Sequence, residues 1–134
     1  MEPAPRHQAR ERAMTLLYEA DIKGETPTAV VSQLPVPPDA FTERLLRATE
    51  ARSPDIDRLI EEAAIDWHLD RMPVVDRTIL RLAVAELLEV PESPTAVVLD
   101  EAVGLSSEYS TDASGRFVNG VLATVVLRVR GSEE

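Results

Sequence analysis

Hydrophobic side chains recur at intervals of three and four residues along most of the chain, which is the spacing of a helix with one buried face. The first such segment has its apolar stripe at Ala9, Ala13, Leu16, Leu17 and Ala20. Gly24 follows this stripe at the position where a helix commonly ends. The pattern predicts a first helix over residues 6–23.

Capping residues followed by proline mark the starts of three later helices. These pairs are Thr26-Pro27, Ser53-Pro54 and Ser93-Pro94. The first of these helices is predicted to reach about Leu34, and the last to fade in the polar stretch 106–110. Three more helices are predicted to begin after other breaks in the pattern, at Asp39, after Met72-Pro73 and near Thr111 or Asp112.

Seven helices joined by short loops, without an alternating strand pattern between them, predict an all-α bundle. The break at Met72-Pro73 predicts a seam between two packed helical subdomains of one domain, roughly residues 1–72 and 73–134. Trp67 ends the apolar stripe of the fourth helix, so we expect it in the core.

The last helix contains one departure from helical preference, the dipeptide Asn119-Gly120. It interrupts a regular apolar stripe, although a glycine inside a helix costs about 1 kcal/mol relative to alanine. Two explanations remain open, since a missing side chain permits the close approach of another helix or of a ligand. We favour helix packing at Gly120 and ligand contact at Asn119, whose amide both donates and accepts hydrogen bonds.

The chain has 134 residues, of which 44% are hydrophobic, with one Trp, two Tyr, two Phe and no Cys. This composition indicates one domain with an aliphatic core, and it excludes disulfides and thiolate metal sites. No apolar run reaches the ~20 residues that cross a bilayer, and the polar N-terminus lacks the hydrophobic region of a signal peptide. We expect a cytoplasmic protein without a membrane partner.

The net charge of −10 is unevenly distributed. Residues 1–12 and 113–134 each contain three arginines and two glutamates, so the segment between them carries −12. If the two ends meet in the fold, they form a small basic site on an acidic body, which would repel RNA elsewhere and attract a basic protein. Solubility alone is an equally good explanation of the acidic surface.

Two arginines lie near the start of the first helix, where the helix dipole disfavours positive charge by about 0.3–1 kcal/mol. Arg6 and Arg10 form a stripe with Met14 and Tyr18 beside the apolar face. We therefore predict anion binding by Arg6 and Arg10, with His7 adding a hydrogen-bond donor.

Residues suited to catalysis are scarce. His7 and His68 are the only histidines, and His68 and Asp70, two positions apart, would face different sides of a helix. The glycines are scattered and form no phosphate-binding loop. We expect neither enzymatic activity nor a bound metal or cofactor.

Four segments hold a series of motifs that covers most of the chain in order. They read RHQARERA with LLYEA, VVDRTILRLA with ELL, DEAV, and FVNGVL. In combination these motifs resemble the family of bacterial transcription antitermination proteins called NusB. The resemblance implies an all-helical fold of two subdomains. It also implies a protein that, with the ribosomal protein NusE, binds single-stranded boxA-like RNA of nascent ribosomal transcripts within an antitermination complex of RNA polymerase.

The resemblance also implies which residues contact each partner. RNA contacts would come from the first helix and the start of the last, at Arg6, His7, Arg10, Asp112, Arg116, Phe117 and Asn119. The NusE surface would include Tyr18, Asp70 and Asp76. We expect Arg6 and Arg10 to lie beside Phe117 in one cationic cradle for unpaired nucleotides. Family members often have more basic residues at His7 and Gln8, so RNA affinity would depend on NusE.

Other functions remain open. A helical adaptor or dimerisation module would use its basic ends only to bind acidic groups, and Met14 would suit either a homodimer interface or the core. A ribosomal RNA cytosine methyltransferase with a NusB-like N-terminal domain would need a further domain for its methyl donor.

Overall fold

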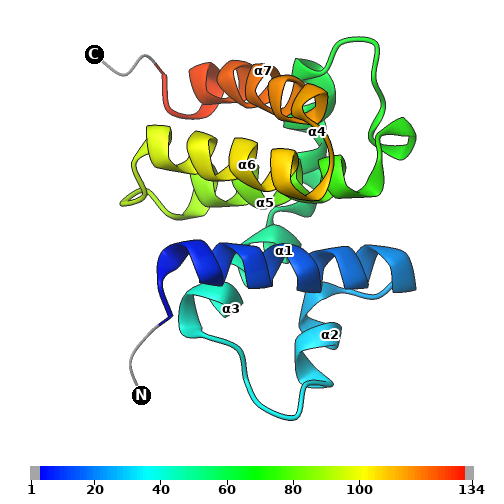
Figure 1. Cartoon of the computed structure of the whole chain (residues 1–134), viewed down its shortest axis with the longest axis vertical. Helices are drawn as coiled ribbons and strands as arrows, with labels where there is room; N and C mark the ends of the chain where they lie inside the picture. Colours follow the sequence, from blue (N-terminus) through cyan, green and yellow to red (C-terminus); the bar gives the residue numbers. More distant parts are fainter. Residues whose placement is uncertain (1–3, 132–134) are drawn as a thin grey trace.

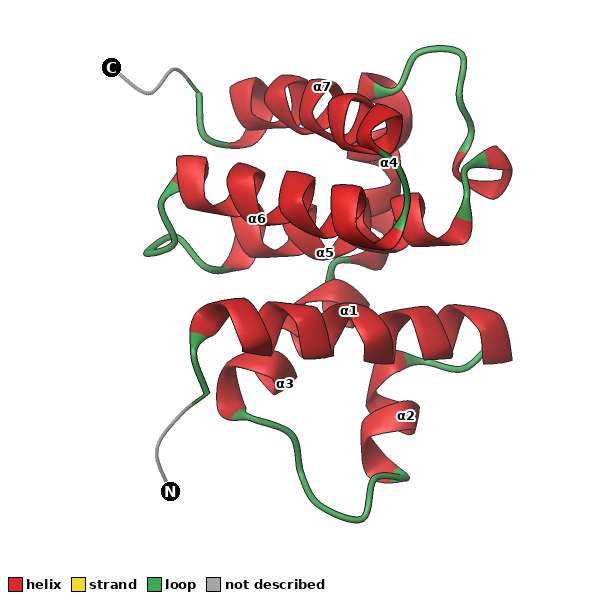
Figure 2. Ribbon diagram, in the orientation of Figure 1, coloured by secondary structure: helices red, strands yellow, loops and turns green. Residues whose placement is uncertain are grey.

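The computed structural model describes residues 4–131, and within them it contains seven α-helices, one 3-10 helix and no strand (Figures 1 and 2). The all-α fold predicted from the sequence is confirmed. No helix in this part of the chain is both long and apolar enough to cross a membrane. The elements are α1 (Arg6–Lys23), α2 (Pro27–Ser32), α3 (Ala40–Ala51), α4 (Ser53–Ala63), η1 (Leu69–Arg71), α5 (Val74–Glu89), α6 (Thr95–Tyr109) and α7 (Asp112–Val129).

Side-chain caps fix where several helices begin. The hydroxyl of Thr26 accepts a hydrogen bond from the backbone amide of Ala29 at 3.2 Å, at the start of α2. Asp39 and Thr111 accept in the same way from amides in the first turns of α3 and α7. These bonds satisfy amides that have no partner within the helix, which is why the sequence predicts these starts correctly.

The neighbouring residues predict the end of α1 correctly but not the end of α6. The predicted bounds of α1 are confirmed, and Gly24 closes it in the left-handed region with φ of 66°. α6 is longer than expected and continues through the polar stretch to Tyr109. The buried Ser106 hydroxyl donates to the carbonyl of Ala102 at 2.8 Å, so this serine remains compatible with the helix.

The helices pack as two layers around one core (Figure 1). α1 contacts α2 and α3, whereas α4 contacts α5 and α7, and α5 also contacts α1 and α3 across the layers. α4 precedes the predicted seam at residue 72 but packs on helices that follow it. We therefore propose α1–α3 and α4–α7 as the two subdomains, in place of residues 1–72 and 73–134.

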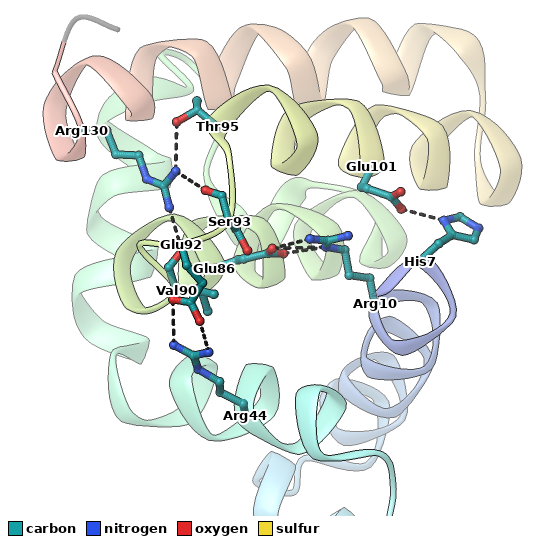
Figure 3. Close-up of polar contacts among 10 residues, drawn as sticks. All are labelled: His7, Arg10, Arg44, Glu86, Val90, Glu92, Ser93, Thr95, Glu101 and Arg130. Atoms are coloured by element: carbon teal, nitrogen blue, oxygen red, sulfur yellow. Dashed lines mark hydrogen bonds and ion pairs between the residues drawn. The ribbon is translucent and has the colours of Figure 1, made fainter. Parts of the chain in front are cut away.

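The loop between α5 and α6 is held by arginines from both layers (Figure 3). Arg130, directly after α7, donates to the carbonyls of Val90 and Ser93. Arg44 of α3 pairs with Glu92 of the same loop at 2.5 Å and lowers the pKa of that carboxyl to about 2. The loop therefore connects the two layers by charged hydrogen bonds.

Trp67 does not lie in the core, and the prediction that it does is wrong. Its side chain is 51% exposed. α4 ends at Ala63, and the following loop contains Asp66 with a φ of 76°, so the helical stripe does not continue to Trp67. The tryptophan instead stands at the surface beside Phe117 of α7.

The glycine that permits close helix packing in α7 is Gly115, not Gly120. A Cβ at Gly115 would lie 2.8 Å from Ser107 Oγ and 3.5 Å from Val103 on α6. A Cβ at Gly120 would meet no atom within 4 Å, because this position faces outward. Our preference for close packing at Gly120 is therefore wrong, while Asn119 is exposed and its ligand contact stays a prediction.

These two glycines should respond oppositely to added side chains. Gly115→Val is expected to lower the free energy of unfolding by about 1–3 kcal/mol, because its branches would meet α6. Gly120→Ala is expected to raise it by about 0.5–1 kcal/mol, since it removes backbone freedom from the unfolded chain without a clash. Urea denaturation measures both, and a stable Gly115→Val beside a destabilised Gly120→Ala would contradict this packing.

Candidate nucleic-acid interface

The start of α1 places its two arginines against an aromatic ring of α3. The guanidinium carbon of Arg6 lies 3.7 Å from the centroid of the Phe41 ring, and that of Arg10 lies 5.5 Å from it. Phe41 is buried, whereas Arg6 is exposed. Arg6 is thus held in a cation–π contact with part of its surface still available to an anion.

Arg10 is engaged inside the protein (Figure 3). Its side chain is 7% exposed and donates through Nε and Nη2 to both carboxylate oxygens of Glu86 on α5, at 2.7–3.2 Å. Glu86 is itself buried and raises the pKa of Arg10 through this hydrogen bond. The prediction that Arg10 binds RNA is corrected, because its guanidinium joins α1 to α5 rather than facing solvent.

Side chains of α6 form hydrogen bonds with side chains near the start of α1. His7 Nδ1 lies 2.6 Å from Glu101 Oε2, and this hydrogen bond raises the pKa of His7 (Figure 3). The hydroxyl of Tyr109 donates to Glu11 at 2.6 Å, which raises the pKa of Tyr109 to about 12. An RNA phosphate near His7 would therefore compete with Glu101 for the imidazole.

A second surface lies at the start of α7. Asp112 and Arg116 are exposed there, and Phe117 is half-buried. The Phe117 ring meets Trp67 edge-on, with centroids 6.2 Å apart and planes at 68°. Residues in the first turns of α5 and α7 and directly before them complete a cavity of about 260 Å³ beside the two rings, lined by Met72, Pro73, Asp76, Thr111, Ala113 and Ser114.

Two arginines are next in sequence to residues of this second surface. Arg116 directly precedes Phe117, and Arg71 directly precedes Met72. Both are exposed, and neither forms an ion pair with any residue in 4–131. Aromatic rings and arginines are groups that bind unpaired bases and their phosphates, and here they stand among the exposed acids Asp70 and Asp112.

The predicted cradle that joins Arg6 and Arg10 to Phe117 is wrong. The two arginines contact Phe41 and Glu86, whereas Phe117 contacts Trp67. Figure 1 shows α1 beginning at the left of the molecule and α7 beginning at the right. The N-terminal arginines and Phe117 therefore belong to different surfaces.

The residues expected to meet a partner protein differ in accessibility. Tyr18 is 40% exposed beside a small apolar cavity that it shares with Val75 and Tyr109. Asp70 is exposed and lines an open cavity with other acids and with Arg77 and Arg81. Asp76 is only 4% exposed. It therefore cannot contact a partner at the open surface as predicted, and only a group that enters the cavity beside Phe117 could reach it.

The apolar spacing does not predict the roles of Glu86 and Trp67. Glu86 stands within the apolar segment Ala83-Val84-Ala85-Glu86-Leu87, and a lone acid in such a segment is a signal for a buried ion pair. Its partner Arg10 is 76 residues away, so only the fold identifies it. The exposure of Trp67 depends on the conformation of the loop after α4, which helical spacing does not predict.

Comparison with known proteins agrees with this architecture. Residues 7–127 match the model of the NusB family. Transcription antitermination protein NusB from Acidothermus cellulolyticus is 48% identical over 126 residues, covering 90% of this chain and 86% of the relative. The structure of T. maritima NusB has a TM-score of 0.83 at 31% identity, covering 92% of both chains. A structure of NusB and NusE in complex with dsRNA has a TM-score of 0.76 at 31% identity, covering 90% of this chain and 94% of that one. In sequence and in fold, this chain belongs to the NusB family.

Proposed function

We propose that this chain is a non-enzymatic, RNA-binding antitermination factor that acts in the cytoplasm. Together with NusE it binds boxA-like RNA of nascent ribosomal transcripts, and the assembly joins RNA polymerase and suppresses premature termination. The observation on which this rests is the similarity, over nine-tenths of the chain, to a NusB solved with NusE in complex with dsRNA.

The charges of the chain support a complex in which both this protein and NusE contribute contacts to RNA phosphates. The unpaired Arg71 and Arg116 offer phosphate contacts beside Trp67 and Phe117. The rest of the chain is strongly acidic and would repel RNA. Because Arg10 is bound to Glu86, this chain has few free cations of its own, and a basic partner at Tyr18 and Asp70 would supply more.

RNA affinity should therefore depend on the partner. We expect the complex with NusE to bind a boxA-like oligonucleotide at least about tenfold more tightly than this chain alone, since a second basic surface adds phosphate contacts. Fluorescence anisotropy with labelled RNA measures both affinities at one fixed salt concentration. A scrambled RNA of equal length is the control for sequence preference. Equal affinity with and without NusE would refute the cooperative mechanism.

A further inference from the structure

Two of the basic side chains in residues 6–10 are paired with acids of the protein itself (Figure 3). Arg10 is bound to the buried Glu86 of α5. His7 Nδ1 lies 2.6 Å from Oε2 of Glu101 on α6. The start of α1 therefore presents less positive charge than its sequence alone indicates.

The pair of His7 and Glu101 is accessible to a ligand. The two side chains are 55% and 23% exposed. The hydrogen bond engages Nδ1, which leaves Nε2 of the ring for a phosphate. Glu101 raises the pKa of His7 through this hydrogen bond, and the charges of Glu11 and Glu108 act in the same direction. The acids thus favour the protonated imidazole, but the carboxylate beside it cancels its charge.

We propose that Glu101 limits RNA binding at the start of α1, because it cancels the charge of His7 and repels a phosphate that approaches the ring. This role rests on the proposed function, and Glu101 would set RNA affinity without itself contacting RNA. A phosphate shared by Arg6 and His7 would lie close to the Glu101 carboxylate, and repulsion at that range is only partly screened by salt. Arg10 does not compensate, since both carboxylate oxygens of Glu86 hold its guanidinium.

Glu101→Gln tests this role because the amide oxygen still accepts a hydrogen bond from Nδ1 while the negative charge is removed. At about pH 6 an imidazole without a carboxylate partner remains largely protonated, so the variant gains a cation for one phosphate. In complex with NusE, the slope of log affinity against log salt for boxA-like RNA should become steeper by about 0.7. That change corresponds to about fivefold tighter binding at about 0.1 M salt, measured by fluorescence anisotropy.

Two controls separate the effect on His7 from the overall charge of the chain. Asp100→Asn removes the same charge from an exposed position one residue earlier on α6, and it should change RNA affinity by less than about twofold. His7→Gln combined with Glu101→Gln removes both charges of the pair, so this double variant should bind RNA as the unaltered chain does. Unfolding curves measured in parallel show that each variant is folded.

An unchanged or weaker RNA affinity for Glu101→Gln, in a complex whose unaltered form binds RNA, would overturn this role of Glu101 and leave the proposed function standing. An equal gain in Asp100→Asn would assign the effect to overall charge and would also overturn it. A gain that persists in the double variant would do the same, because His7 would not carry the effect. Absence of RNA binding by the unaltered complex would instead refute the proposed function.

Discussion

Replacing Glu86 by alanine is expected to lower the free energy of unfolding by about 3–5 kcal/mol, because it leaves the guanidinium of Arg10 buried without its counter-charge. The two side chains are 7% and 2% exposed and share three hydrogen bonds. They connect α1 to α5 and hence one layer to the other. Urea denaturation followed by circular dichroism measures the loss.

Replacing both partners shows how much of this loss comes from leaving one buried charge without its counter-charge. Arg10→Met combined with Glu86→Met should recover most of the stability, since no buried charge remains and the methylenes keep much of the volume. Lys23→Ala, which breaks the exposed pair with Glu19, should leave the denaturation midpoint almost unchanged. A Glu86→Ala protein as stable as the Lys23→Ala protein would show that Arg10 and Glu86 are not paired.

Arg130→Ala is expected to cost about 2–3 kcal/mol, the second largest loss among the charged residues considered. The guanidinium of Arg130 donates to the carbonyls of Val90 and Ser93 and to the hydroxyl of Thr95, at 2.7–3.0 Å (Figure 3). It also donates to the carbonyl of Leu87 at 3.1 Å. Leu87 lies in the last turn of α5, where carbonyls lack partners within the helix and a cation is favoured by the dipole.

An arginine two residues earlier provides the matched control. Arg128 of α7 pairs with Glu62 at 2.7 Å, and both side chains are 46% exposed. Arg128→Ala should therefore cost less than about 1 kcal/mol, because water replaces an exposed ion pair at little expense. Thermal unfolding of the two variants tests the difference, and equal midpoints would mean that Arg130 does not secure the loop between α5 and α6.

The sequence predicts the fold well because the helix limits depend on neighbouring residues. Thr26 and Asp39 cap amides within the next three positions, and Gly24 supplies a left-handed end. Apolar spacing then identifies the buried face of each helix. The spacing does not distinguish helix packing at Gly115 from open surface at Gly120, because that depends on where α6 lies.

The site is less predictable because its contacts join distant segments. The dipole argument identifies Arg6 and Arg10 as unusual, but it cannot tell a buried partner such as Glu86 from a bound anion. The family resemblance correctly indicates the fold, yet it does not reveal that Asp76 is buried beneath Ser114 or that Trp67 stands beside Phe117. The burial of Asp76 and the contact between Trp67 and Phe117 depend on the conformation of the loop after α4 and on the direction of α7.

The most direct test of RNA binding at the start of α7 compares two arginines of one helix, measured as boxA-like RNA affinity across a range of salt in the presence of NusE. Arg116 is exposed and unpaired among the described residues, whereas Arg128 is paired with Glu62. We expect Arg116→Gln to weaken binding and to reduce the slope of log affinity against log salt by about 0.7, the value for one lost phosphate contact on a single strand. Arg128→Gln should bind as the unaltered chain does. An unchanged slope for Arg116→Gln, or equal losses in both variants, would contradict an RNA surface at this end of α7.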